Sequence, residues 1–337
     1  MRHFVIAGIL VIVGAVLTYV GLTAVHLMPV EASVQSISID WLFNLELITI
    51  SFLFALIVVP MIYSLIVFRR RRGDDTDAEH IEGNVPLEIT WTVVRLILVV
   101  VFAYLGAYSL GETRRVDPNA MIIKVTGFQW AWRFDYPDFG FTTDQLYLPV
   151  DKQVVLQMES PDVIHSFWVP EFRIKQDVVP GRITQYRITP NLIGSYKVRC
   201  SELCGISHAY MEAPVNVVSQ QDFDSWTAQQ KAAAEALANT PGPDAGKAAV
   251  QSFGCFACHT VDGTKLIGPT WRGLYGSQVK LADGTTVTAD DAYIKQSILD
   301  PASQVVHGFP PMSFNAKALG ITDQQISNII EYIKTLK

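Results

Sequence analysis

Cysteine, histidine and charged residues are all scarce in this sequence. Only 4 of the 337 residues are cysteine and 7 are histidine, and charged residues make up 17% of the chain. Four cysteines in two short clusters are too few for the dense disulfide framework of a small secreted protein. The net charge is −6, so the chain has no basic excess, and we expect no nucleic acid among its partners.

Hydrophobic residues, in contrast, make up half of the chain, which indicates that part of it contacts membrane lipid. Three apolar stretches, at 4–22, 41–68 and 91–110, are close to the roughly 20 residues that a helix needs to cross the hydrocarbon layer. Four arginines follow the second stretch, and the positive-inside rule places the loop 69–90 on the cytoplasmic side. We therefore predict a transmembrane helical hairpin at 41–110, with everything after it outside.

Residues 1–32 allow two interpretations. Arg2, the apolar run and the sequence Val30-Glu31-Ala32 are typical of a signal peptide with a small-residue cleavage site. The apolar run is longer than the usual core of a signal peptide, which favours an additional transmembrane helix. Both interpretations leave the segment that follows on the outer side.

Residues 112–220 predict an all-β domain. Short β-rich segments separated by Pro-, Gly- and Asp-containing turns replace the continuous apolar runs here. Their number and spacing favour a Greek-key sandwich or barrel. Loops at one end of such a scaffold can converge on one site.

A set of metal ligands lies between the last two predicted strands. The spacing of two thiols, an imidazole and a thioether favours copper among the biological metals. A mononuclear copper electron-transfer site needs one cysteine, so this chain has one thiolate too many, and two cysteines four residues apart can instead bridge two coppers. The residues are Cys200, Glu202, Cys204, His208 and Met211, with His165 from an earlier loop as the second histidine.

Met211 and the backbone carbonyl of Glu202 are the natural weak ligands, one for each copper. The competing interpretation is a structural zinc site made by the two cysteines and two histidines, which leaves Met211 and Glu202 without a role. A disulfide between the cysteines is a further alternative. A redox dithiol is disfavoured, because the spacing is not Cys-x-x-Cys and no βαβ pattern surrounds it.

The second cysteine cluster, Cys255-x-x-Cys258-His259, has the spacing of a c-type haem attachment site. The two thiols would attach the haem covalently and His259 would bind its iron. After His259 only His307 and Met312 remain as candidates for the sixth ligand. Methionine–histidine ligation raises the haem potential, as an electron relay on the donor side requires, so we favour Met312 and keep His307 as the alternative.

The end of the chain divides into a linker and a helical domain. Residues 221–245 are rich in Ala and Gln and end in a Pro- and Gly-containing turn, which predicts a short helix followed by a linker. Residues 246–337 predict an all-α cytochrome c domain. Its closing helix has Thr322 as the N-cap, Gln325 three positions on, and isoleucines at helical spacing.

The metal cluster resembles the CuA site of cytochrome c oxidase subunit II, and the resemblance covers about 41–218. It implies a cupredoxin-like Greek-key β-barrel in which Cys200 and Cys204 bridge two coppers and each histidine binds one. In that family the Glu between the cysteines also faces a magnesium at the interface with subunit I, which implies the same for Glu202. The C-terminal domain resembles the class I cytochromes c.

Two further residues have counterparts in this family. The aromatic run 127–134 resembles a segment whose first tryptophan passes electrons from a docked cytochrome to copper, which implies that Trp130 is an electron relay. Core packing is the alternative for its neighbours Trp132 and Phe134. Glu88 aligns with a Glu near the entrance of a proton path, although a carboxylate at the start of a helix needs no such role.

These features predict a multidomain membrane protein that acts as the electron-transfer subunit of a respiratory terminal oxidase. It would lie in the plasma membrane of a prokaryote, with the copper and haem domains on the outer face. A soluble or membrane-bound donor would reduce the haem, and electrons would pass through copper to subunit I, which reduces oxygen to water. The alternatives are a membrane-anchored copper-binding or copper-delivery protein and a CuA subunit of a nitrogen-oxide reductase.

Overall fold

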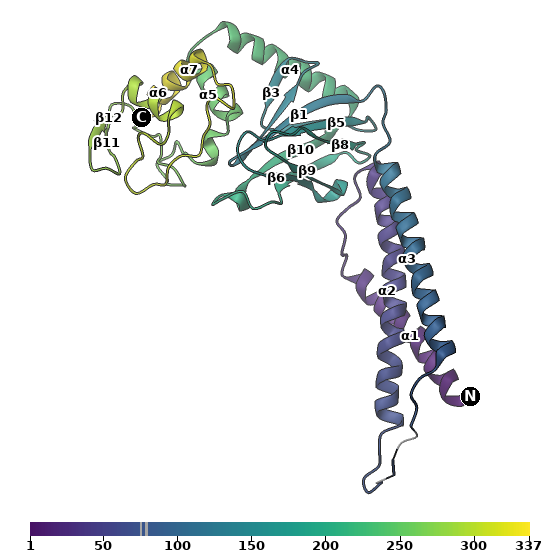
Figure 1. Ribbon diagram of the computed structural model, residues 1–337. Coiled ribbons are helices and arrows are strands. Elements are labelled where there is room, and N and C mark those ends of the chain that lie inside the picture. The colour runs from purple at the N-terminus through teal and green to yellow at the C-terminus, as the bar shows by residue number, and fades with distance from the viewer. Residues whose placement is uncertain (75, 78–79) are drawn as a thin grey trace. The chain divides into compact units, whose positions relative to one another are not determined.

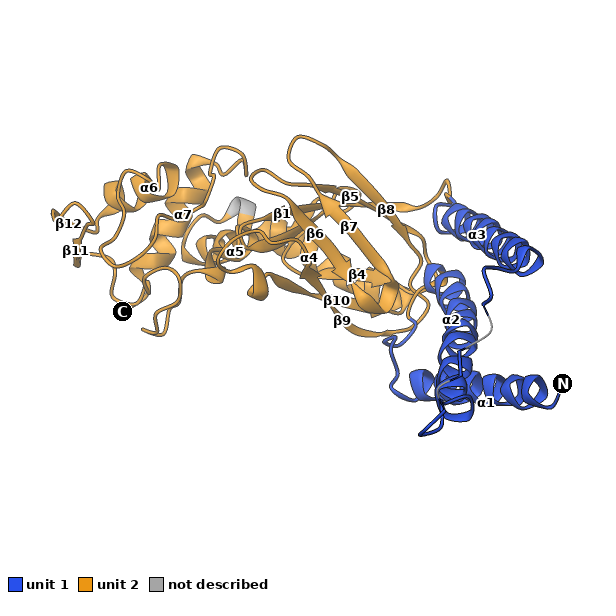
Figure 2. Ribbon diagram, turned by 60° about the horizontal axis from the view of Figure 1, so that its bottom comes forward, with its two compact units in different colours: residues 1–31, 35–115 blue, residues 32–34, 116–337 orange. Residues whose placement is uncertain are grey.

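A computed structural model describes residues 1–74, 76–77 and 80–337. The chain divides into two compact units, one of residues 1–31 and 35–115 and one of residues 32–34 and 116–337 (Figure 2). Residues 75, 78 and 79 belong to the predicted cytoplasmic loop and lie outside the described residues.

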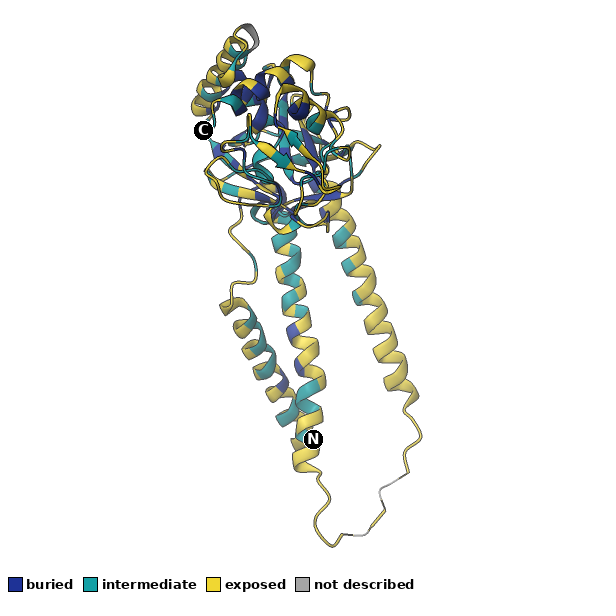
Figure 3. Cartoon of the chain, turned by 90° about the vertical axis from the view of Figure 1, so that its left-hand side faces the viewer, coloured by how far each residue is buried: buried dark blue, intermediate teal, exposed yellow. Residues whose placement is uncertain are grey.

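The first unit consists of three long apolar helices. They are α1 (Arg2–Ala24), α2 (Val34–Val67) and α3 (Val85–Thr113), and each contains one of the predicted apolar stretches, the second of which runs one residue past α2. By length and composition all three can cross a membrane. Most of their side chains are exposed or only half-buried, as Figure 3 shows. Outward-facing apolar side chains on helices with internally paired backbones suit a lipid environment.

Small residues bring α1 close to α2. A Cβ atom on Gly14 would lie 3.1 Å from Cγ2 of Val59 and 3.4 Å from Cβ of Ala55. Nearby, the Tyr19 hydroxyl donates a hydrogen bond to Oδ1 of Asn44 at 2.8 Å. Close approach at small residues, with a polar contact between the helices, is the usual way in which membrane helices associate.

After residues 32–34, the second unit continues with a β domain (residues 116–218), which Figure 1 shows as a sandwich. It consists of two five-stranded sheets. In spatial order the strands are β3-β2-β1-β5-β8 and β4-β10-β9-β6-β7. Residues on alternate positions of these strands fill the core between the sheets, as in other β-sandwiches. The strands are β1 (Met121–Phe128), β2 (Ala131–Tyr136), β3 (Phe141–Thr143), β4 (Leu146–Pro149), β5 (Val154–Glu159), β6 (His165–Val169), β7 (Ile174–Val178), β8 (Thr184–Ile188), β9 (Gly194–Cys200) and β10 (Glu212–Val218). This architecture confirms the predicted cupredoxin-like β fold.

A short segment from the N-terminal part of the chain is built into the β domain. Ala32 and Ser33 are both fully buried there. Ser33 Oγ donates a hydrogen bond to the carbonyl of Phe172 at 3.0 Å. Three backbone hydrogen bonds complete the attachment: Ala32 N–H to Glu171 O at 3.0 Å, Val34 N–H to Thr189 O at 2.9 Å and Asn191 N–H to Ala32 O at 3.2 Å.

We expect the peptide bond between Ala32 and Ser33 to stay intact in the mature protein. Cleavage after Ala32 would create a charged amino group at Ser33, which is fully buried, and an unpaired buried charge is costly. The packing of α1 against α2 also favours a retained helix. Intact-mass measurement of the purified chain checks this, and a mature chain that begins at Ser33 would contradict it.

The helix α4 (Gln220–Asn239) occupies most of residues 221–245, where a short helix followed by a linker was predicted, and it packs on the β domain. Phe223 is buried in the core of the β domain, and the ring of Trp226 stacks on that of Tyr147 with 4.1 Å between their centroids. The Ser219 side chain caps the start of the helix. α4 is therefore anchored by two aromatic side chains one helical turn apart.

The C-terminal domain (residues 243–337) is mainly helical. It contains α5 (Pro243–Ser252), α6 (Asp291–Leu299), α7 (Asp323–Lys334) and a small hairpin of β11 (Gln278–Lys280) and β12 (Thr286–Thr288). Thr322 and Gln325 form the predicted capping box of α7, and the isoleucines at helical spacing are buried. α5 crosses α7 at Gly246, where a Cβ atom would lie 1.9 Å from the carbonyl oxygen of Asn328.

Candidate metal centre and haem cavity

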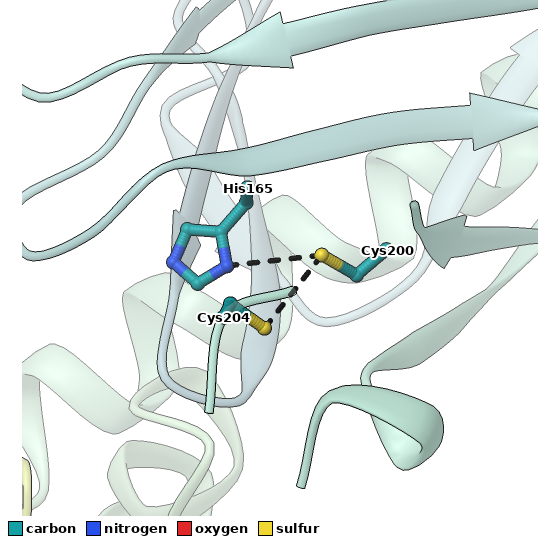
Figure 4. A group of neighbouring side chains, drawn as sticks. All are labelled: His165, Cys200 and Cys204. Atoms are coloured by element: carbon teal, nitrogen blue, oxygen red, sulfur yellow. Dashed lines mark hydrogen bonds between the residues drawn. The ribbon is translucent and has the colours of Figure 1, made fainter. Parts of the chain in front are cut away.

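The predicted metal ligands converge at one end of the second sheet. His165 begins β6, Cys200 ends β9, and Cys204 lies in the loop between β9 and β10. The two sulfur atoms are 3.7 Å apart, and Nδ1 of His165 lies 3.9 Å from the Cys200 sulfur (Figure 4). All three donor atoms lie within 4.8 Å of one another, and all three residues are buried.

The other three predicted donors surround the same pair of sulfurs. Nδ1 of His208 lies 3.5 Å from the Cys204 sulfur, and the thioether sulfur of Met211 lies 3.8 Å from it. On the other side, the Cys200 thiol donates to the carbonyl oxygen of Glu202 at 3.2 Å. Met211 is buried, His208 is half-buried and the Glu202 side chain is exposed. A thiol pair with imidazole, thioether and carbonyl donors on either side fits soft metal ions such as copper.

The two thiols differ in acidity because their surroundings differ. Burial opposes ionisation of Cys200, but hydrogen bonds with His165 and with the backbone around it lower the pKa of this thiol. Burial and the nearby Cys200 charge raise the pKa of the Cys204 thiol to about 12. Cys200 is therefore the more acidic of the two thiols, and both must lose their protons to bind a metal.

A half-buried carboxylate that the sequence did not single out orients His165. Oδ1 of Asp162 lies 2.9 Å from Nε2 of His165, and the backbone N–H of Gln129 donates to Oδ2 of Asp162 at 2.7 Å. Burial opposes ionisation of Asp162, but these hydrogen bonds outweigh it and lower the pKa of the carboxyl. A carboxylate that holds one ring nitrogen leaves the other facing the metal position. Its place three residues before His165 was the only signal in the sequence.

The loop that carries Cys204 is held from the β1–β2 turn. The carbonyl oxygen of Cys204 accepts hydrogen bonds from Nε2 of Gln129 at 2.6 Å and from the indole N–H of Trp130 at 3.1 Å. A Cβ atom on Gly205, whose φ is +124°, would lie 2.9 Å from the Trp130 ring. The ring and the metal loop therefore touch directly.

We expect Asp162→Asn to weaken copper binding by about 10–100-fold, the usual effect of losing a supporting carboxylate. The amide can still occupy the space, but it cannot hold the charge that pairs with the His165 ring. Copper titration against a competing chelator measures the change. Asp144→Asn, which alters a half-buried carboxyl without a hydrogen bond to the metal ligands, is the control. Equal affinity of the Asp162 variant and the unchanged protein would contradict this role.

A cavity of about 430 Å³ lies beside Cys258 and His259. Its lining is largely apolar and includes Trp271, Ile294 and Phe309. Cys255 lies in the short 3₁₀ helix η3 (Cys255–Ala257) and, with Cys258, lines a smaller adjoining cavity of about 60 Å³. An apolar space bordered by the Cys-x-x-Cys-His sequence fits a covalently attached haem.

The surroundings of His259 suit an iron ligand. Its Nδ1 lies 2.8 Å from the carbonyl oxygen of Pro269, so Nδ1 carries the proton and Nε2 keeps its lone pair. Burial lowers the pKa of His259, which keeps the ring neutral. The ring stacks on Trp271, and a Cβ atom on Gly268 would lie 2.7 Å from Cε1 of His259, so only glycine fits there.

The two candidates for the sixth ligand differ in their surroundings. Met312 is half-buried and lines both the larger cavity and the smaller one beside the two cysteines. His307 lines the larger cavity, but it is exposed, and its backbone N–H is bonded to Lys280 O at 2.9 Å. Met312 lines the same small cavity as Cys255, Cys258 and His259, so its position favours it as the sixth ligand.

The aromatic run and Glu88 occupy different environments. Trp130 lines the larger cavity as well as bonding to the Cys204 carbonyl, so it contacts both candidate sites. Trp132 and Phe134 are buried in the core of the β domain, which agrees with the packing alternative.

The exposed Glu88 carboxylate accepts a hydrogen bond from the backbone N–H of Asn84 at 3.3 Å, at the start of α3.

The fold and the two sites define a membrane-anchored electron-transfer subunit with a cupredoxin-like domain and a cytochrome c domain. Three family descriptions match the chain: cytochrome c oxidase subunit II, transmembrane domain, at residues 21–110; its periplasmic domain at residues 141–218; and cytochrome c at residues 243–337. The chain belongs to the cytochrome c oxidase subunit II family and is an electron-transfer subunit of a haem–copper oxidase complex.

Named relatives extend over most of the chain. Cytochrome c oxidase subunit 2 of Alkalihalophilus pseudofirmus is 33% identical over 317 residues, which is 88% of this chain and 88% of that protein. The subunit 2 of Synechocystis is 32% identical over 285 residues and covers 70% of this chain and 83% of its own length. The crystal structure of the periplasmic domain of subunit II from Bradyrhizobium japonicum is 34% identical, with a TM-score of 0.33, and covers 34% of this chain and 97% of that one.

Proposed function

We propose that this subunit carries electrons from a covalently bound haem c to a dinuclear copper centre and on to subunit I, which reduces oxygen to water. The observation that carries the proposal is the contact of Trp130 with both sites: it bonds to the Cys204 carbonyl and lines the cavity beside His259. Both domains would lie on the outer face of a prokaryotic plasma membrane, as the arginine-rich loop between α2 and α3 indicates.

The donor geometry favours two coppers over one zinc. Cys200 and Cys204 would bridge the metals, with His165 beside one sulfur and His208 beside the other. A tetrahedral zinc site would use these four residues alone. The thioether of Met211, however, is buried 3.8 Å from the Cys204 sulfur, and thioether ligands suit copper rather than zinc. Bound copper would supply one-electron redox chemistry, which zinc lacks.

In the C-terminal domain, Cys255 and Cys258 would hold the haem, and His259 and Met312 would bind its iron. A haem so ligated supplies one-electron transfer at a raised potential. The residues of the chain fix its surroundings: Pro269 orients the His259 ring, and the apolar lining excludes water. An external electron donor would reduce this haem first.

Two assignments concern contacts with the rest of the complex. The exposed carboxylate of Glu202 would face a magnesium ion shared with subunit I, while its carbonyl faces the copper site. Glu88 would lie near the entrance of a proton path in the complex. Its carboxylate is exposed and accepts a hydrogen bond from the backbone N–H of Asn84.

The alternative functions fit the chain less well. A copper-delivery protein needs exchangeable metal with few ligands, whereas here four further donors gather around the two cysteine sulfurs. A nitrogen-oxide reductase subunit would share the copper centre, but the transmembrane match at residues 21–110 is to an oxidase subunit.

The decisive experiment is an electron paramagnetic resonance spectrum of the oxidised full-length protein, with copper and iron counted in the same sample. We expect a hyperfine pattern from one electron shared by two coppers, together with one haem iron per chain. A mononuclear copper signal or bound zinc would refute the electron-exit half of the proposal. Absence of covalent haem, seen as haem lost on acid–acetone extraction, would refute the other half.

A further inference from the structure

Side chains of the β domain pack into the hydrophobic core of the C-terminal domain where the two domains meet. Phe128, the last residue of β1, is 3% exposed and packs in the hydrophobic core of the C-terminal domain rather than in that of its own domain. Ala131, the first residue of β2, packs against the same core. The β1–β2 turn, which carries Trp130, is therefore inserted into the surface of the C-terminal domain.

Gly254 is the residue that this turn meets. Its φ is +63°, and a Cβ atom there would lie 2.5 Å from Cβ of Ala131 and 3.1 Å from the ring of Phe128. Side chains do not approach so closely, so any larger residue at 254 has to push the two domains apart. Gly254 directly precedes Cys255, so a displacement here is passed on to the haem-attachment sequence.

Arg133 joins the same two surfaces beside this contact. Its Nη1 donates a hydrogen bond to the carbonyl oxygen of Leu319 at 3.4 Å, and its guanidinium carbon lies 5.9 Å from the centre of the Phe253 ring. The Arg133 side chain is only 16% exposed, which strengthens a cation–π contact. The contact surface therefore has an apolar centre, made by Phe128 and Ala131, and a hydrogen bond from Arg133 beside it.

The connection between the domains is also short and held. α4 is anchored on the β domain by Phe223 and Trp226, and α5 begins at Pro243, only a few residues after α4 ends. Within that gap the backbone N–H of Gly242 donates to Oδ1 of Asn328 at 3.2 Å. A haem domain that moved relative to the β domain would need a flexible connection. The connection here is anchored near both of its ends.

We propose that Gly254 is a positioning residue: it lets the C-terminal domain rest on Ala131 and thereby sets the separation between haem and copper. The inference rests on the proposed function, since it concerns the step in which ferrous haem gives one electron to oxidised copper and becomes ferric. Electron tunnelling weakens steeply with distance, so the backbone contact at Gly254 controls the rate without touching either metal.

The test compares two glycines with nearly the same backbone conformation. Gly254→Ala introduces a methyl group that meets Ala131, whereas Gly273→Ala, at φ +66°, introduces one into open space. Both variants carry the same backbone strain, so the difference between them reports the domain contact alone. Ala131→Leu tests the same contact from the β domain, at a residue outside the haem-attachment sequence.

Three quantities are measured on the full-length oxidised and reduced protein. Copper and haem contents come first, because their absence in the unchanged protein would refute the proposed function and not the role of Gly254. The second is the enhancement of the copper spin relaxation by ferric haem, which reports the separation of the two centres. The third is the rate of electron transfer from haem to copper after the haem has been reduced by an added photoreductant in a light pulse.

We expect Gly254→Ala and Ala131→Leu to keep both cofactors, to weaken the relaxation enhancement and to slow electron transfer from haem to copper, since tunnelling weakens steeply with distance. Gly273→Ala should match the unchanged protein in all three measurements. Unaltered transfer in the first two variants, or equal slowing in Gly273→Ala, would overturn the proposal.

Discussion

Replacing Cys204 with serine is expected to remove the shared-electron copper signal and to stop electron delivery from the haem to the partner subunit. The Cys204 sulfur lies within 3.5–3.8 Å of donor atoms of Cys200, His208 and Met211, so its loss disconnects three other ligands. A hydroxyl is also a poor ligand for copper compared with a thiolate. The effect should exceed the roughly 10–100-fold loss expected when only a supporting hydrogen bond is removed.

Copper content, the paramagnetic resonance spectrum and oxygen consumption by the assembled oxidase measure this loss. The haem absorption spectrum should stay unchanged, because Cys204 lies outside the haem cavity. Ser201→Ala, in the same loop, is the control and should bind copper as the unchanged protein does. Two coppers with an intact shared-electron signal in the Cys204 variant would show that this sulfur is not a bridge.

Replacing Met312 with alanine is expected to leave the haem covalently attached but to lower its reduction potential. Thioether ligation stabilises ferrous iron, and axial ligands set haem potentials across roughly 0.8 V, so we expect a decrease on the order of 0.1 V or more. Reduction of the haem by the external donor then becomes less favourable, whereas electron transfer from the haem to copper gains driving force. Redox titration followed in the haem absorption bands measures the change.

His307→Ala is the matched comparison, because both residues line the same cavity. It should leave the potential close to that of the unchanged protein. The reverse pattern, with an unchanged potential in Met312→Ala and a shifted one in His307→Ala, would identify the histidine as the sixth ligand. Loss of haem from either variant would be detected by acid–acetone extraction before the titration.

The candidate copper ligands were predictable from the sequence because five of them lie in one short loop with distinctive donor chemistry. His165 lies 35 positions before Cys200 and was found because the β domain contains so few histidines. Asp162 and Gln129 were not found, since a polar residue that supports a ligand has no characteristic spacing. Their roles depend on the β1–β2 turn lying beside the metal loop, which is a tertiary contact.

The membrane helices and the closing helix α7 were predictable for a different reason. Each has a long apolar or amphipathic pattern with clear end signals, such as the capping box of Thr322 and Gln325. The contact between Gly254 and Ala131 has no such pattern, because small residues are compatible with many environments. The Ala- and Gln-rich composition predicted a short helix before the linker, but it did not show that Phe223 and Trp226 anchor this helix on the β domain.

The attachment of residues 32–34 to the β domain affects how a soluble fragment of this protein should be made. A truncation that starts after α3 would omit Ala32, Ser33 and Val34, and the carbonyl groups of Glu171, Phe172 and Thr189 would lose their donors. Each lost hydrogen bond contributes about 1 kcal/mol, and the space around buried Ala32 would open. A recombinant fragment that carries this tripeptide, for example as an N-terminal extension or an added peptide, would complete the domain without the membrane helices.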